Sequence, residues 1–163
     1  MLFTLIDVIL IGLLIAFIVV GFMIGLVSGI GALFGVLAGA YVAGHYYLVV
    51  ANWLTPVIFG NTAIAKIVAF IAIFVIINGL IGLIFWFVDR AYKLISIVPF
   101  LKSINHFGGM ILGFCEGVLV LGLSVYVIVK LGADISWLMK MFNDSVVAHY
   151  LLFATQFLNS FLP

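Results

Sequence analysis

Few side chains in this sequence could do chemistry, and Glu116 stands out because it lies in the middle of a long apolar stretch. If that stretch crosses a membrane, a charge at its centre costs on the order of 2.5–3.5 kcal/mol. Without a cation beside it, we expect this carboxyl to face another helix and to be protonated near neutral pH. It is therefore a candidate proton-responsive or ion-contacting group. The alternative is a neutral carboxyl hydrogen-bonded across helices, for instance to Asn78.

Two more polar side chains lie within apolar stretches. Asp7 is near the outer end of the first one, where we interpret it as an interfacial group or a helix-start cap rather than as part of a proton relay. Asn78 is in the middle of the third, where its amide is suited to hydrogen bonding between helices. Glu116, Asn78 and Asp7 together form the candidate intramembrane polar site.

The sequence shows no catalytic, cofactor-binding or metal-binding pattern. His45, His106 and His149 lie in three separate segments without metal-ligand spacing, and Cys115 has no base near it in sequence. No hydrolase or phosphate-binding motif is present. We therefore expect a protein that is not an enzyme and that holds no cofactor.

The surrounding elements must be membrane helices. Residues 8–65 contain no Asp, Glu, Lys or Arg. As one helix they would extend about 87 Å, nearly three times the ~30 Å hydrocarbon core of a bilayer, so the stretch must fold back within lipid. Hydrophobic residues make up 68% of the chain and charged ones 7%, which excludes an ordinary soluble domain. The net charge of +1, without a basic stripe, argues against a nucleic-acid partner.

We predict an all-α membrane protein of four transmembrane helices followed by a C-terminal amphipathic helix, in one domain that covers residues 1–163. Glycine supplies the break between the first two spans, at about residues 24–28, and Thr62 is placed to cap the third. No basic segment precedes the first span and no small-residue cleavage site follows it, so we expect it to be retained. The predicted spans are residues 4–23, 29–50, 63–88 and 107–129.

Two further segments lie outside these spans. Residues 90–105 are basic at both ends and apolar between, which predicts an interfacial connection. In residues 138–161 the polar residues fall on one helical face and the apolar residues on the others. This pattern predicts an amphipathic helix that lies on the membrane or packs on the bundle. Basic residues cluster in residues 89–106, which favours a cytoplasmic position for this loop and a periplasmic one for both termini.

Glycines spaced four residues apart recur in three runs. Such a run stays on one helix face and lets two backbones approach closely, which is how membrane helices pack. We expect a tight pair between the second and fourth spans or a seam between copies of the chain, and the sequence leaves both open. The runs are Gly21, Gly25 and Gly29; Gly31, Gly35 and Gly39; and Gly109, Gly113 and Gly117.

Several stretches resemble the colicin V production family of bacterial inner-membrane proteins. They are Ile6-Asp7, residues 42–47 (Val-Ala-Gly-His-Tyr-Tyr), residues 105–120 and residues 160–163. The length, the four-span layout and the amphipathic tail are similar as well. The resemblance implies an integral inner-membrane protein needed for colicin V production and linked to envelope processes. The partners we expect are the lipid bilayer and either a second copy of the chain or other envelope membrane proteins.

The chain departs from the family pattern at charged positions. The family's fourth span opens with Asp-Arg and later places a basic residue before a glycine, where this chain has Asn105-His106 and Glu116-Gly117. The basic and acidic residues of the family's first turn are replaced here by Ile24-Gly25 and Gly29. We interpret these changes as joint losses from one ion-pair network. Restoring charges at Ile24 and Glu116 together should then be tolerated better than restoring either alone.

Three classes of function follow. A non-enzymatic accessory or scaffold for toxin export and envelope maintenance is favoured, because polar lining is too sparse for a clear pathway. A small channel or proton-responsive transporter would need Glu116, Asn78 and other polar groups to face one cavity or symmetry axis. An intramembrane enzyme would need a nucleophile beside a base.

Overall fold

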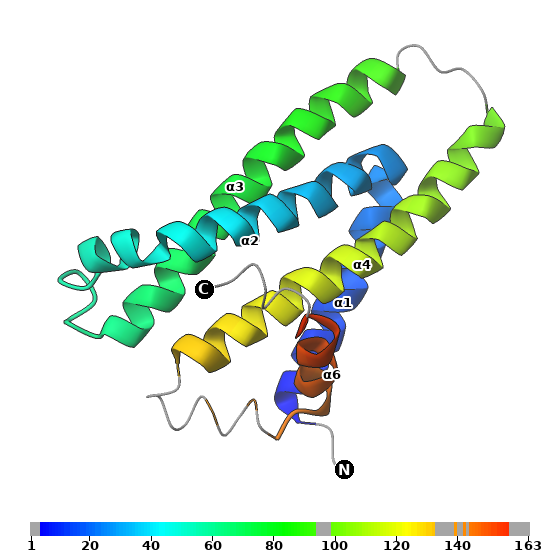
Figure 1. The fold of residues 1–163 in the computed structure, drawn as a ribbon. Helices are drawn as coiled ribbons and strands as arrows, with labels where there is room; N and C mark the ends of the chain where they lie inside the picture. Colours follow the sequence, from blue (N-terminus) through cyan, green and yellow to red (C-terminus); the bar gives the residue numbers. More distant parts are fainter. Residues whose placement is uncertain (1–3, 94–98, 133–138, 140–141, 143, 157–163) are drawn as a thin grey trace.

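The computed structural model describes residues 4–93, 99–132, 139, 142 and 144–156. This part of the chain contains five helices and no strand (Figure 1), which confirms the predicted all-α fold. By length and composition, α1 to α4 each contain a stretch that can cross a membrane. The helices are α1 (Leu5–Ile24), α2 (Leu26–Leu54), α3 (Thr62–Lys93), α4 (Pro99–Leu131) and α6 (Val146–Ala154).

The four long helices pack as two antiparallel pairs that meet along α4 (Figure 1). One pair is α1 with α4, and the other is α2 with α3. Helices α2 and α4 run in the same direction, since Gly29 lies against Leu112 while Gly44 and Val127 line one cleft further along. The short helix α6 packs against α1 and α4, so the predicted tail helix is packed on the bundle over its described residues. The remainder of residues 138–161 lies largely outside the described part.

Buried apolar side chains form two main clusters, and α4 contributes to both. The first cluster joins α2, α3 and α4, and the second joins α1, α4 and α6. Dispersion contacts in such clusters, together with close backbone packing, hold helices together in lipid, where apolar burial gives no extra driving force. The first contains Val36, Ala40, Ala43, Phe70, Phe74, Leu123 and Val127; the second contains Leu10, Leu121, Val125, Ala148 and Leu151.

Helix boundaries differ from the sequence expectation at three points. The break between α1 and α2 is Gly25 alone, in a left-handed conformation with φ of +88° that glycine adopts without strain. Asn61, not Thr62, caps α3, because its Oδ1 accepts a hydrogen bond of 3.1 Å from the Ile64 N–H. Helix α4 begins at Pro99, a residue favoured at the first helical position. Residues 99–105 are therefore the start of α4 and not part of a separate connection.

The expected pairing of glycine runs between the second and fourth spans is wrong. The run in α4 packs against α1: a Cβ on Gly109 would lie 2.6 Å from the Cα of Gly25, and one on Gly21 would lie 2.7 Å from the Cα of Gly113. The reason is the break at Gly25, which leaves Gly21 in α1, antiparallel to α4. The run Gly31, Gly35 and Gly39 instead receives side chains of α3, namely Phe85, Asn78 and Phe74.

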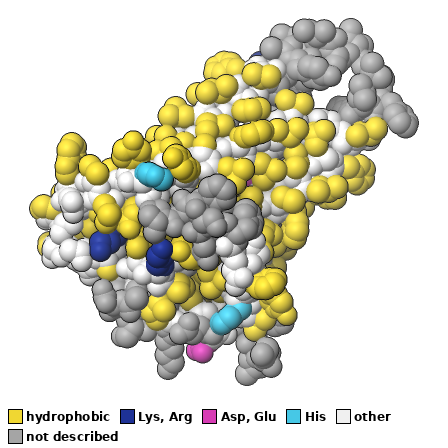
Figure 2. All heavy atoms as spheres, in the orientation of Figure 1, with side chains coloured by type: hydrophobic (Ala, Val, Ile, Leu, Met, Phe, Trp, Pro, Cys, Tyr) yellow, Lys and Arg dark blue, Asp and Glu magenta, His cyan; other side chains and the backbone are white. Residues whose placement is uncertain are grey.

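Large apolar side chains cover much of the outer surface of the described bundle (Figure 2). Val75, Ile76 and Ile84 on α3 each expose about 60% of their area, which suits contact with lipid tails. The basic side chains visible in Figure 2 lie mainly toward the left of the view, where α4 ends and α3 begins. The chain is thus a membrane protein, and the basic side chains seen in this view lie near the ends of its spans.

Candidate functional site

Asp7 is at the start of α1 and is completely buried. It is the third residue of a capping box: the Asp7 N–H donates to Thr4 Oγ1 at 3.3 Å, and the Thr4 N–H donates to Asp7 Oδ2 at 2.8 Å. The Thr4 hydroxyl also donates to Oδ2, at 2.8 Å. This arrangement satisfies backbone donors that the first turn of a helix leaves open. Asp7 thus has the helix-start role that the sequence indicates.

The second carboxylate oxygen of Asp7 connects α1 to α6. Oδ1 accepts hydrogen bonds from the Ser145 hydroxyl at 2.7 Å and from the Val147 N–H at 2.8 Å. Ser145 is itself the N-cap of α6, because its Oγ accepts from the Ala148 N–H at 3.1 Å. The N-termini of α1 and α6 therefore meet at one carboxylate, and both helix dipoles favour its negative charge. We call Asp7, Thr4, Ser145 and Val147 the Asp7 node.

Asn105 caps a helix other than its own. Its Oδ1 accepts a hydrogen bond of 2.9 Å from the Leu26 N–H, the first residue of α2. Gly25 precedes Leu26 and has no side chain to provide this cap. The Asn105 amide also packs directly over the Gly25 Cα, where a Cβ would overlap it. Asn105 of α4 therefore provides the N-cap that α2 lacks because Gly25 precedes it.

His106 contacts the end of α1, on the other side of the Gly25 break. Its Nδ1 donates to the carbonyl oxygen of Phe22, in the last turn of α1, and its ring lies 5.2 Å from the Phe22 ring. Cations and donors are favoured at helix C-termini because the last carbonyls have no partner within the helix. We call Asn105 and His106 the turn clamp. Sequence reasoning noted this pair as a departure from a family pattern but did not single it out as a site.

Glu116 is half-buried on α4 and has no hydrogen bond or ion pair among the described residues. Gly113 and Gly117 contact α1, whereas Leu112 contacts α2. At 100° per residue, Glu116 lies between these two rows. It is level with Leu14 and Phe17 of α1, which Gly117 touches, and so lies about two turns from Ile24. The structure therefore places Ile24 at the turn clamp, and the suggested joint restoration of charge at Ile24 and Glu116 has no geometric basis.

Asn78 packs against α2 and not against Glu116. Its Oδ1 is buried without a hydrogen-bond partner, as is the hydroxyl of Ser28 on α2. A Cβ on Gly35 would overlap the Asn78 amide oxygen and lie 3.2 Å from the Asn78 carbonyl oxygen. Asp7, Asn78 and Glu116 thus lie in three different places in the bundle. The described residues do not bring them into one polar site.

The three histidines each donate from Nδ1 to a backbone carbonyl. His45 bonds to Tyr41 at 3.2 Å and His149 bonds to Ser145 at 2.9 Å, each four residues earlier in the same stretch, while His106 bonds across helices. Cys115 is exposed on α4. Within the part of the chain that the structure describes, no group of three His, Cys, Asp or Glu side chains is placed to hold a metal ion.

A comparison with models of protein families gives a match. A family model described as colicin V production protein matches residues 6–156, which is most of the chain. The matched range contains the turn clamp, α6 and every residue of the Asp7 node except Thr4. No curated protein and no solved structure matches the chain.

Proposed function

Because the chain belongs to the colicin V production protein family, we propose that it is a bacterial inner-membrane protein that supports colicin V production, toxin export and envelope maintenance. In this proposal it acts as a non-enzymatic accessory or scaffold. Its partners are other envelope membrane proteins or a second copy of the chain.

One observation supports the scaffold role. The polar side chains with the most hydrogen bonds join helix ends to one another and do not line a path. Asp7 ties α6 to α1, and Asn105 and His106 tie α4 to the break between α1 and α2. A channel or transporter needs a continuous row of polar groups across the bilayer. Polar side chains that hydrogen-bond one helix end to another favour a rigid bundle, and a rigid bundle can serve as a binding surface for other proteins.

A small channel or proton-responsive transporter is the second candidate. It is favoured by Glu116, which has no partner in the described bundle, and by the unpartnered oxygens of Ser28 and Asn78. An unsatisfied polar atom within a membrane helix is costly, so such atoms mark functional positions. This candidate requires these three groups to face one water-filled path.

Two experiments separate these candidates. In a colicin V-producing strain that lacks its own family member, expression of this chain should restore the zone of growth inhibition around a colony. The purified chain in proteoliposomes with an internal pH dye should give no proton flux above that of protein-free vesicles. Failure to restore production with the chain inserted in the membrane would contradict the proposal, and clear flux would favour the transporter.

The proposed topology places the loop of residues 89–106 in the cytoplasm and both termini in the periplasm. The contact of the α1 and α6 N-termini at Asp7 supports a common side for the starts of these two helices. Single cysteines at Lys102 and Asn159, in a Cys115→Ser background, should react from opposite sides with a membrane-impermeant thiol reagent. Labelling of both from the same side would contradict this topology.

A further inference from the structure

The loop between α2 and α3 presents large apolar side chains at one end of the bundle (Figure 1). Trp53, in the last turn of α2, exposes 80% of its area, Val57 exposes 73%, and Phe59 is completely exposed. Residues 51–65 contain no charged side chain. Loops that face water are normally polar, and exposed apolar residues that lie close together mark a contact surface. We call Trp53, Val57 and Phe59 the apolar tip.

Hydrogen bonds fix the backbone of this loop, so the tip has a defined shape. The Ile58 N–H donates to the Leu54 carbonyl oxygen at 3.0 Å, and the Gly60 N–H donates to the Thr55 carbonyl oxygen at 3.0 Å. Ile58 fills the inward side of the loop, because it packs on a small cluster of buried alanines from α2 and α3. The cluster contains Ala51, Ala65 and Ala69. Phe59, the next residue, makes almost no contact with the described part of the chain.

Phe59 has a backbone conformation that is unfavourable for its residue type. Its φ is +50°, in the left-handed region that bulky residues rarely adopt, and among the described residues only glycines share a positive φ. Glycine at this position would avoid the strain. Strained residues persist mainly where the side chain has a function, and Phe59 has no packing role inside the bundle. Its ring is therefore placed for a contact outside the chain.

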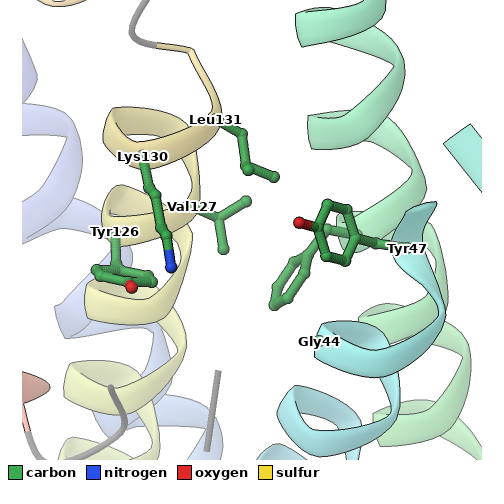
Figure 3. A pocket seen from close by; sticks show the side chains of 7 residues that line it. Gly44, Tyr47, Tyr126, Val127, Lys130 and Leu131 are labelled. Atoms are coloured by element: carbon green, nitrogen blue, oxygen red, sulfur yellow. The ribbon is translucent and has the colours of Figure 1, made fainter. Parts of the chain in front are cut away.

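The tip lies at the level of lipid headgroups. Helix α2 has 29 residues, so it is about 43 Å long and matches the roughly 40–45 Å of a bilayer with both headgroup layers. Tyr47 and Lys130 line one small cleft between α2 and α4 (Figure 3), and Tyr47 is two turns before the end of α2. Tyrosine and lysine prefer the edge of the hydrocarbon core, where their polar ends reach the headgroups. The tip lies beyond this edge, in the layer that tryptophan favours.

We propose that the apolar tip inserts into the headgroup layer of the adjacent leaflet and anchors the α2–α3 end of the bundle there. Val57 and the Phe59 ring reach toward the acyl chains, and the Trp53 indole lies among the polar groups. Lipid is the occupant because the tip continues the lipid-facing surface of α2. Leu48 and Val49 are exposed as well, and no charged residue lies between them and the tip. This anchoring does not depend on the scaffold function.

Tryptophan fluorescence in vesicles tests the anchor. Phe59→Trp is made in the full chain after Trp53, Trp86 and Trp137 have been replaced by Phe, and the protein is reconstituted in phosphatidylcholine with brominated acyl chains. We expect strong quenching by bromine at shallow acyl positions and weak quenching by aqueous iodide. Ile76→Trp, at an exposed position in the middle of α3, is the matched control and should be quenched most by bromine at deep positions. Stronger quenching of Phe59→Trp by iodide than by shallow bromine would overturn the proposal, because the tip would then lie in water.

Phe59→Gly separates anchoring from folding. It removes the strain and the ring together, so the thermal midpoint in detergent should equal or exceed that of the unchanged protein. A cysteine at the exposed Thr62, in a Cys115→Ser background, should then react faster with a membrane-impermeant thiol reagent in vesicles. Phe153→Ala removes an exposed ring on α6 and should leave this rate unchanged. A lower midpoint for Phe59→Gly, or the same rate in both variants, would contradict the anchor.

Discussion

At the scale of single residues, the buried charge of this protein is stabilised by backbone and hydroxyl donors rather than by a cation. Each carboxylate oxygen of Asp7 accepts two hydrogen bonds, from Thr4 on one side and from Ser145 and Val147 on the other. Hydrogen bonds to a charged acceptor are shorter and stronger than neutral ones. The same carboxylate begins α1 and fixes α6, so one substitution tests both.

Asp7→Asn should release α6 from the bundle. The amide nitrogen that replaces one oxygen cannot accept a hydrogen bond, and the node loses its charge, at a cost of about 2–3 kcal/mol. Hydrogen–deuterium exchange of the α6 amides, above all those of Val147 and Ala148, should become faster while exchange in α3 stays unchanged. Asp144→Asn is the matched control, because Asp144 is exposed and one residue before the α6 cap. Equal exchange in the two variants would contradict the role of the node.

Glu116→Gln should leave colicin V production intact. Glutamine keeps the size and the hydrogen-bonding capacity of a protonated carboxyl, and the described structure gives Glu116 no partner whose loss would unfold the chain. The zone of growth inhibition should therefore match that of the unchanged protein at acidic and at neutral pH. A loss of production, or a changed response to pH, would contradict the scaffold proposal and favour the transporter.

At the scale of helices, the sequence predicts the elements well and their partners poorly. The four spans and the break near Gly25 follow from hydropathy and glycine, because both are local properties. The pairing of α4 with α1 depends on the positive φ of Gly25, because this residue decides which glycines belong to α1. From the sequence alone, the glycine runs that begin at Gly21 and at Gly31 are equally suited to pack against α4. The Asn105 cap joins residues 79 apart in the chain, a separation that no local pattern reveals.

Gly109→Ala should destabilise the bundle, whereas Gly79→Ala should not. The added methyl on Gly109 would meet the backbone of Gly21 and Gly25, which cannot move aside without separating α1 from α4. Gly79 has no neighbour within 4 Å on that side, so alanine there only improves helix propensity, by up to about 1 kcal/mol. Thermal unfolding in detergent should show a lower midpoint for Gly109→Ala and an equal or higher one for Gly79→Ala. Equal decreases would contradict the backbone contact.

The turn clamp should accept a restored charge pair at Ile24 and Asn105. Asn105→Asp keeps the oxygen that accepts from the Leu26 N–H, and its charge suits the N-terminus of α2. Adding Ile24→Arg beside it should give a favourable coupling of roughly 0.5–1 kcal/mol in a double-mutant cycle of unfolding free energies. The control cycle combines Ile24→Arg with Glu116→Gln, two turns apart, and should be additive. Coupling in the control but not at Asn105 would contradict the geometry of the clamp.

At the scale of the whole molecule, α4 is the helix that packs against both halves of the bundle. It shares one buried cluster with α2 and α3 and another with α1 and α6. The sequence could not predict this role, since α1 to α4 are all apolar and of similar length and nothing local marks one as central. Nor could it predict that Asp7, Asn78 and Glu116 lie apart, because each residue suits a membrane interior and only the packing decides which helix it faces.

Cross-linking should distinguish this packing from the arrangement that the sequence first suggests. Cysteines at Leu10 and Leu121, which share the buried cluster of α1, α4 and α6, should be joined within one chain by a short thiol cross-linker. Cysteines at Leu10 and Val36 lie in different clusters and should not be joined, so they form the matched control. Both pairs need a Cys115→Ser background, because Cys115 is exposed. A Leu10–Leu121 product that runs as a dimer on a denaturing gel would instead mean that α1 meets the α4 of a second copy, and the seam would then lie between chains.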